Sequence, residues 1–323
     1  MKLTKKKKRG LTENMNYKEL VDPELRKSAV SYPFNKGVID AGNLYQELDW
    51  RMTKIPADMK EEMIIMEGAH DFPVKTTVFS PSSSKEELPA LVYVHGGGFV
   101  YKAASYQKKL AINYAGQAGC RVFFPHYHLA PKYPYPAAYE DILSVYRYVM
   151  LHADELGVDK ERIGLAGDSA GASIAALVCN RWEKEQINMP CLQMLVYPVT
   201  DARMETDSMK RYTDTPMWDS RTNERMWSYY CGEDLELKKQ ASPMLCSLPS
   251  KLPGTYIETA QYDCLHDEGV AYAGKLKEAG AEVELNETEG TFHGYDAATG
   301  AQIVIRNINR RISFLKGRFK EEI

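Results

Sequence analysis

The sequence RIGLAGDSAGAS, residues 162–173, contains the pattern G-x-S-x-G with Ser169 at its centre. The apolar residues before the pattern predict a strand and the small residues after it predict a helix, so Ser169 lies in a sharp turn between the two. Gly167 and Gly171 leave room for the strained backbone of such a turn. The hydroxyl of Ser169 is then exposed at a helix N-terminus, where free N–H groups favour negative charge. A turn rich in glycine and serine that only caps a helix fits the same pattern.

Short strand-like segments alternate with helix-length segments on both sides of this turn. We predict strands at residues 63–66, 74–79, 90–95, 121–125, 162–166, 192–197, 255–259 and 282–287. Several of these are almost continuously apolar, as is typical of strands covered on both faces. Helices are predicted at residues 137–152, 169–186, 266–279 and about 302–320. The alternation predicts an α/β fold with a mostly parallel eight-stranded sheet and helices on both faces.

Two regions interrupt this alternation. Residues 1–50 show helical pieces without a strand, and residues 200–240 are polar and aromatic with several methionines. We expect residues 1–50 to form an N-terminal cap segment and residues 200–240 a cap insertion. Residues 51–199 and 241–323 then form the core that contains the sheet.

Composition excludes several classes of partner. The chain has 44% hydrophobic and 26% charged residues with a net charge of −3, which gives no reason to expect nucleic acid or a membrane as a partner. Its apolar runs fall short of the roughly 18–20 residues that span a bilayer. The basic run at residues 5–9 is interpreted as a solvated terminus. Six scattered cysteines indicate reduced thiols and a cytoplasmic location, and a homodimer stays open.

A second glycine-rich motif, HGGGF at residues 95–99, follows a predicted buried strand. Consecutive glycines let backbone N–H groups approach a substrate closely, as the oxyanion of an acyl-transfer intermediate requires. The predicted donors are the N–H groups of Gly97, Gly98 and Ala170. A phosphate-binding loop is the competing interpretation, but the spacing fits neither GxxxxGK[ST] nor GxGxxG.

A serine nucleophile needs a base, and the base needs an orienting acid. His293 follows the last predicted strand, and Asp263 is the first acidic residue after the preceding one. Asp267 and Asp201 are the alternative acids. The order Ser169, Asp263, His293 is the order of an α/β hydrolase.

These motifs together resemble the hormone-sensitive-lipase-like family of α/β hydrolases, which includes bacterial carboxylesterases and acetyl esterases. The resemblance extends from about residue 88 to residue 295 and rests on HGGGF, GDSAG, the HLAP segment at residues 128–131, the stretch after Asp263, and FHG at residues 292–294. It implies a helical cap over the pocket and hydrolysis of small acyl esters without a metal or organic cofactor. The family usually has arginine where this chain has His128, and an arginine also stands at His266 in its D-P-L-R-D-E pattern.

The predicted function is therefore a serine carboxylesterase acting on short-chain, acetyl-like esters through an acyl-enzyme intermediate. The alternatives are an amidase or peptidase on the same fold and a non-catalytic ligand-binding relative, although relatives of the latter kind lose the histidine. His126 and His128 share a strand spacing that could suit a metal, but no third ligand is evident, so we predict no metal site. The substrate is a small-molecule ester, and its pocket wall is predicted to include Phe99, Tyr101, Met217 and Trp218.

Overall fold

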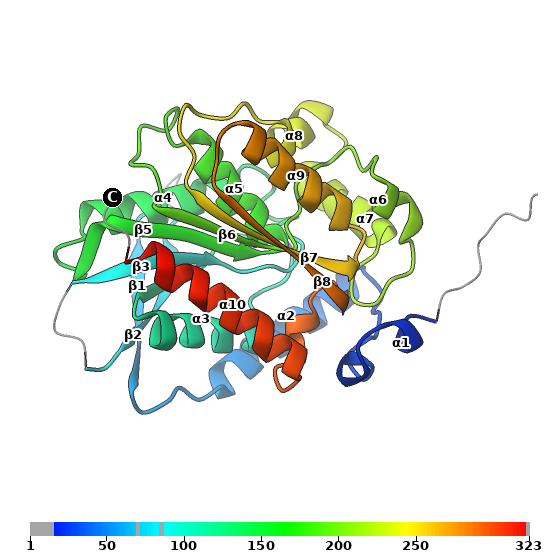
Figure 1. The fold of residues 1–323 in the computed structure, drawn as a ribbon, viewed down its shortest axis with the longest axis horizontal. Coiled ribbons are helices and arrows are strands. Elements are labelled where there is room, and N and C mark those ends of the chain that lie inside the picture. Colours follow the sequence, from blue (N-terminus) through cyan, green and yellow to red (C-terminus); the bar gives the residue numbers. More distant parts are fainter. Residues whose placement is uncertain (1–15, 69–71, 84–86, 321–323) are drawn as a thin grey trace, which may run out of the picture.

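The computed structural model describes residues 16–68, 72–83 and 87–320, so the basic run at residues 5–9 lies outside the described residues. One eight-stranded sheet, ordered β1-β2-β4-β3-β5-β6-β7-β8, runs through the molecule (Figure 1). Its strands are β1 (Met59–Met66), β2 (Val74–Pro81), β3 (Leu88–Val94), β4 (Arg121–His126), β5 (Val158–Asp168), β6 (Leu192–Val196), β7 (Gly254–Tyr262) and β8 (Val283–Phe292).

The sheet confirms the predicted α/β-hydrolase architecture. β2 runs antiparallel to β1 and β4, and the remaining pairs are parallel. All eight predicted strands are present, but several are longer than predicted. β5 begins at Val158 because that residue pairs with Leu88 of β3, ahead of a register shift. β8 extends to Phe292, which pairs with Tyr262, and so it leads directly into His293.

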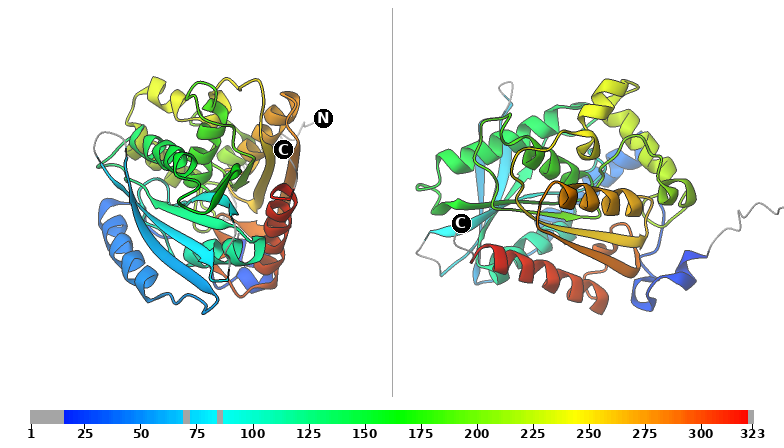
Figure 2. Two further views of the ribbon diagram at one scale, coloured as in Figure 1. Left: turned by 90° about the vertical axis from the view of Figure 1, so that its left-hand side faces the viewer. Right: turned by 45° about the horizontal axis from the view of Figure 1, so that its top comes forward.

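Helices cover both faces of the sheet. They are α1 (Tyr17–Leu20), α2 (Lys36–Met52), α3 (Ser105–Ala118), α4 (Ala137–Leu151), α5 (Ala170–Arg181), α6 (Asp207–Arg211), α7 (Ser220–Cys231), α8 (Leu235–Gln240), α9 (His266–Glu278) and α10 (Gln302–Arg318), with 3-10 turns η1 (Pro23–Leu25), η3 (Pro243–Leu245) and η4 (Tyr295–Ala297). In Figures 1 and 2, α3 and α10 lie on one face, and α4, α5 and α9 on the other. Two separate clusters of buried apolar residues fill these two interfaces.

Helix α3 has no counterpart among the predicted helices. Its apolar residues Leu110, Ala111, Tyr114 and Ala115 are buried in the cluster that also contains residues of α10. The helix ends at Gly119, whose φ of 68° places it in the left-handed region that glycine favours. The lysines and glutamines within the helix obscure its apolar face in the sequence.

A buried charge network joins α10 to the end of the sheet. The guanidinium of Arg311 donates to Asp296 at 3.1 Å and also contacts Glu258, and all three side chains are fully buried. Tyr197 donates its hydroxyl to the same Asp296 at 2.8 Å. Because a buried carboxylate without a partner is strongly destabilising, Arg311 fixes the segment that directly follows His293.

The segment between η1 and α2 packs against the long connection between β6 and β7. The backbone N–H of Met217 donates to the carbonyl of Val30 at 2.8 Å, and the rings of Phe34 and Trp218 meet edge to face at 5.5 Å. The two regions that interrupt the strand–helix alternation in the sequence are therefore in contact. In the ranges described, no helix combines the length and apolar character needed to cross a bilayer.

Candidate active site

Ser169 occupies the turn between β5 and α5 with a φ of 54°. The flanking glycines are required there by close backbone contacts. A Cβ added to Gly167 would lie 2.5 Å from the carbonyl carbon of Gly171, and one added to Gly171 would lie 2.1 Å from the carbonyl oxygen of Val94. The turn can therefore form only with glycine at both positions, which explains the G-x-S-x-G pattern in steric terms.

Two hydrogen bonds connect Ser169 with His293 and Asp263. Oγ of Ser169 lies 2.8 Å from Nε2 of His293, and Nδ1 of His293 lies 2.7 Å from Oδ2 of Asp263. All three side chains are buried. A carboxylate can only accept, so Nδ1 carries a proton and leaves the lone pair of Nε2 facing the serine hydroxyl. The arrangement can accept a proton from Ser169 and hold the resulting imidazolium.

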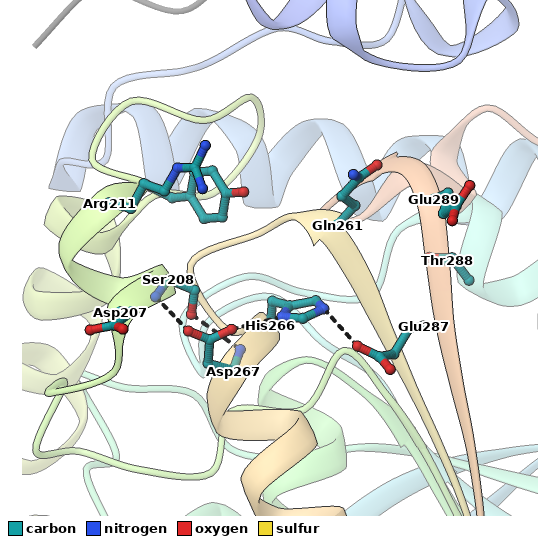
Figure 3. A pocket seen from close by; sticks show the side chains of 10 residues that line it. Asp207, Ser208, Arg211, Gln261, His266, Asp267, Glu287, Thr288 and Glu289 are labelled. Carbon is teal, nitrogen blue, oxygen red and sulfur yellow. Dashed lines mark hydrogen bonds and ion pairs between the residues drawn. The ribbon is translucent and has the colours of Figure 1, made fainter. Parts of the chain in front are cut away.

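The alternative acids bond elsewhere. Asp201 forms an ion pair with Arg203 at 2.6 Å. Asp267 accepts from the backbone N–H of Ser208 at 2.7 Å and contacts His266 at 2.8 Å (Figure 3).

His266 occupies the family's arginine position and forms a link between α9 and β8. Its Nδ1 faces Asp267 and its Nε2 lies 3.2 Å from Glu287, at the wall of an open cavity of about 470 Å³ (Figure 3). The backbone N–H of His266 donates to the carbonyl of Asp263 at 3.1 Å. His266 therefore supports the turn that carries Asp263, and its partners in the described ranges are Asp263, Asp267 and Glu287 rather than His293.

The backbone of the glycine loop adopts conformations that glycine favours. Gly97 and Gly98 have φ values of 120° and 58°, and the carbonyl of Gly97 accepts from the N–H groups of Val100 and Tyr101. Within the part of the chain that the structure describes, no acceptor is bonded to the N–H groups of Gly97 and Gly98. Ala170 is the first residue of α5, where an N–H has no partner inside the helix.

Asp168 anchors this loop, a role that the sequence analysis missed. Its buried carboxylate accepts from the N–H of Gly96 at 3.1 Å, the hydroxyl of Tyr93 at 3.0 Å and Nε2 of Gln107 at 2.7 Å. Burial raises the pKa of Asp168 to about 6, against the lowering effect of Gln107 and the other donors. Its position next to Ser169 is the only sequence signal, because Gln107 comes from the unpredicted helix α3.

The histidines near the loop have packing contacts. His95 stacks on Tyr127 at 4.3 Å, and burial lowers its pKa to about 3. His126 bonds Thr77 at 2.9 Å. His128 contacts Asp141 through both its backbone N–H, at 2.7 Å, and Nδ1, at 2.8 Å, so a histidine replaces the arginine contact expected there. Among the described residues, no group of three or more His, Cys, Asp or Glu side chains is arranged to hold a metal.

The four predicted wall residues have different surroundings. The ring of Trp218 lies 5.8 Å from that of His293, and a Cβ added to Gly98 would lie 2.6 Å from Cη2 of Trp218. Trp218 is thus placed between the glycine loop and the histidine. Met217 reaches the turn after His293, with its Cε 3.8 Å from the Cβ position of Gly294.

The other two wall candidates contact α7 and the segment before α2. Phe99 is buried and stacks on Tyr230 of α7, with ring centres 3.7 Å apart. Tyr101 packs against Phe34 at 6.0 Å. Of the four, Trp218 is therefore the side chain with a direct contact to the Ser169–His293–Asp263 set.

The sequence pattern of the α/β-hydrolase fold family matches residues 91–297. The chain belongs to this family. It is 34% identical over 230 residues to ethyl acetate hydrolase of Pseudomonas putida, covering 70% of this chain and 72% of that protein. It is 31% identical over 301 residues to esterase LipI of Mycobacterium tuberculosis, covering 90% and 92% of the two chains.

Solved structures agree with this assignment. A bacterial heroin esterase superimposes with a TM-score of 0.87 at 29% identity, over 94% of this chain and 99% of that one. The α/β hydrolase described here is a carboxylic ester hydrolase of the hormone-sensitive-lipase-like family, as the resemblance in its motifs predicted.

Proposed function

We propose that this hydrolase cleaves short-chain acyl esters with Ser169 as the nucleophile, His293 as the proton carrier and Asp263 as the orienting acid. The observation that carries the proposal is the unbroken pair of hydrogen bonds, 2.8 Å and 2.7 Å long, from Ser169 through His293 to Asp263. Support also comes from relatives named as esterases, one of them named for ethyl acetate, although one more distant relative is named an arylacetamide deacetylase.

In the proposed reaction, Oγ of Ser169 attacks the ester carbonyl carbon while its proton moves to Nε2 of His293. The N–H groups of Gly97, Gly98 and Ala170 stabilise the oxyanion, and one such donor is worth about 3 kcal/mol in mutational terms. Collapse of the intermediate breaks the bond to the alkoxy oxygen, which leaves as the alcohol with the proton from His293. Water then repeats the sequence on the acyl-enzyme, releases the carboxylic acid and restores Ser169.

The preference for short acyl chains rests on Trp218. Its indole is next to both the glycine loop and His293, so it limits the space beside the reacting carbonyl. We further propose that residues 1–50 and 200–240 act together as a cap, since Phe34 and Trp218 are in contact across them. The homodimer and the cytoplasmic location stay predictions.

The proposal can be tested by labelling and by a substrate panel. A fluorophosphonate should modify Ser169, identified by peptide mass spectrometry, and prior incubation with an excess of a short ester should slow the labelling. Acetyl to octanoyl p-nitrophenyl esters should be hydrolysed faster at the short end, and p-nitroacetanilide far more slowly than the acetate ester. Equal rates on the ester and the anilide would favour the amidase alternative, and no turnover of either would favour the ligand-binding one.

A further inference from the structure

A second cavity, of about 540 Å³, lies on the other side of the glycine loop from Ser169, His293 and Asp263, the proposed triad. Its wall is formed by α2 and α3, by β1 and β2, by the end of β4 and the residues that follow it, and by the residues directly before and after the glycine loop. In the sheet order, β1, β2 and β4 lie on one side of β3, whereas β5, β7 and β8, which carry the triad, lie on the other. β3 and its glycine loop therefore separate the two sites, and this cavity has no part in the proposed chemistry.

The cavity wall carries more positive than negative charge. Its cations are Arg51, Lys75, Lys102 and Lys108, and its carboxylates are Glu47 and Glu61. Glu47 pairs with Lys102 at 2.5 Å and also contacts Arg51, while Glu61 pairs with Lys108 at 2.9 Å. Four cations against two carboxylates leave a formal excess of two positive charges.

The two histidines of the wall are neutral at pH 7. Burial and, to a smaller extent, the charges of Lys75, Lys102 and Lys108 lower the pKa of His126 to about 4. His95 is likewise neutral at pH 7 because burial lowers its pKa to about 3. Neither ring therefore adds charge to the cavity, and neither supplies a negative charge that would pair with the lysines in place of a bound anion.

An apolar surface lies beside these cations. Trp50, Met63 and Leu129 also line the cavity, and the ammonium of Lys108 lies 5.3 Å above the centre of the Trp50 ring. Lys108 is buried at 3% exposure. A ligand that fits both surfaces has an anionic head for the lysines and a small apolar body for the indole and the methionine side chain.

We propose that this cavity binds a small carboxylic acid with an apolar body. The positive excess and the apolar wall select an amphipathic anion, and the choice of a carboxylate rests on the proposed function, because ester hydrolysis releases this class of molecule. The cavity thus gives the enzyme a binding site for its own type of product, separate from the site that makes it.

The surroundings of the cavity connect it to the glycine loop. Asn43 of α2 donates to the carbonyl of Val100 at 3.0 Å and accepts from the backbone N–H of Lys102 at 2.7 Å. Tyr127, in the cavity wall, donates to the carbonyl of His95 at 2.9 Å. A carboxylate that draws Lys102 away from Glu47 loosens the link between α2 and the chain that leaves the loop. We therefore expect the bound acid to lower kcat and to leave KM nearly unchanged.

Benzoate is a suitable probe because it combines a carboxylate with a flat apolar ring. Its binding to the full-length protein should be measured by calorimetry, in the absence of any ester. Lys102→Met should weaken binding at least tenfold, and Glu47→Gln, which removes a competing carboxylate, should strengthen it severalfold. Lys277→Met, on the exposed side of α9, is the matched control and should leave the affinity unchanged.

The opposite shifts of the two variants protect the test from folding defects, since a damaged protein does not bind more tightly. Equal affinity in wild type, Lys102→Met and Glu47→Gln would overturn the site. Inorganic phosphate binding in place of benzoate would overturn the carboxylate class. Because the titration uses no ester, it stands or fails separately from the labelling of Ser169. In a separate kinetic assay, benzoate that only competes with substrate at Ser169 would raise the apparent KM equally in the wild type and both variants, and this result would overturn the proposed effect on kcat.

Discussion

The strand ends that carry Ser169, Asp263 and His293, the proposed triad, differ from the segments of residues 16–50 and 200–240 in how their side chains are held. Ser169 and its neighbours are fixed by backbone contacts that exclude any side chain at Gly167 and Gly171. Trp218 is instead held by an edge contact with Phe34 and by one hydrogen bond from its Nε1 to Asn223 at 3.1 Å. Substitutions at the strand ends should therefore change the rate of the reaction on every substrate. Substitutions in residues 16–50 and 200–240 should change which substrate reacts.

The largest effect is expected at Ser169, the proposed nucleophile. Ser169→Ala should reduce ester hydrolysis by roughly 10⁴–10⁶ because no other group at the turn can form the acyl-enzyme. The small side chain fits the same turn, so circular dichroism and the melting temperature should change little. Retention of more than a few per cent of the activity, after exclusion of contaminating enzyme, would contradict the assignment.

Asp263, the proposed orienting acid, should give the next largest effect. Asp263→Asn should lower kcat by about 10⁴, because an amide at this position favours the wrong tautomer of His293. Asp267→Asn is the matched control, since Asp267 bonds Ser208 and His266 rather than His293, and it should retain most of the activity. A larger loss at Asp267 than at Asp263 would reverse the two roles. Steady-state kinetics on one short ester decides between them.

Asp168, which anchors the glycine loop, should make the free energy of unfolding depend on pH. The pKa of Asp168 is raised by burial to about 6 in the folded protein, above its ordinary value of 3.8, so the folded state binds this proton more tightly. Its contribution to stability is complete below about pH 4 and is lost as the pH rises through about 6.

Asp168→Asn lacks this titration. The free energy of unfolding of the wild type, relative to Asp168→Asn, should therefore fall by up to about 3 kcal/mol between pH 4 and pH 7, given the rise in pKa from 3.8 to about 6. Urea denaturation at several pH values measures the difference. Parallel stability profiles of the two proteins would show that Asp168 does not titrate differently in the folded state.

The smallest effect is expected at Trp218. Trp218→Ala should raise kcat/KM for hexanoyl and octanoyl esters relative to the acetyl ester by about tenfold, because one methylene in an apolar pocket is worth roughly 1–3 kcal/mol. Acetyl ester turnover should survive. Tyr229→Ala, which removes another aromatic contact of Phe34, serves as the comparison and should leave the profile unchanged. A uniform loss at all chain lengths, with a lower melting temperature, would make Trp218 a packing residue alone.

The features that could be predicted from the sequence are those that depend on neighbouring residues. The strands and the turn at Ser169 follow from local patterns, since continuous apolar runs and steric need for glycine are visible in neighbouring residues. The positions of His293 and Asp263 follow from the end of each strand. Helix α3 was missed because Lys108 and Gln107, both buried, interrupt its apolar pattern for reasons that only tertiary contacts reveal.

Contacts between distant segments were not predictable in this way. Gln107 donates a hydrogen bond to Asp168, which is 61 positions away in the sequence. Phe34, near the N-terminus, contacts Trp218 in the connection between β6 and β7. The antiparallel direction of β2 and the extension of β5 to Val158 likewise depend on pairing partners. Of the four wall candidates, the sequence could not show that Phe99 stacks on Tyr230 while Trp218 faces His293.

The buried network of Arg311 has a consequence for the order of events during synthesis. Ser169 precedes its partner His293 by 124 positions, and Asp296 and Glu258 lack their common cation until Arg311 has been added. A growing chain that ends before this residue has two carboxylates to bury without a counter-charge, which opposes closure of the sheet edge. The order of synthesis therefore delays activity: Ser169 is present early, but the proposed triad can be completed only after Arg311 has been added.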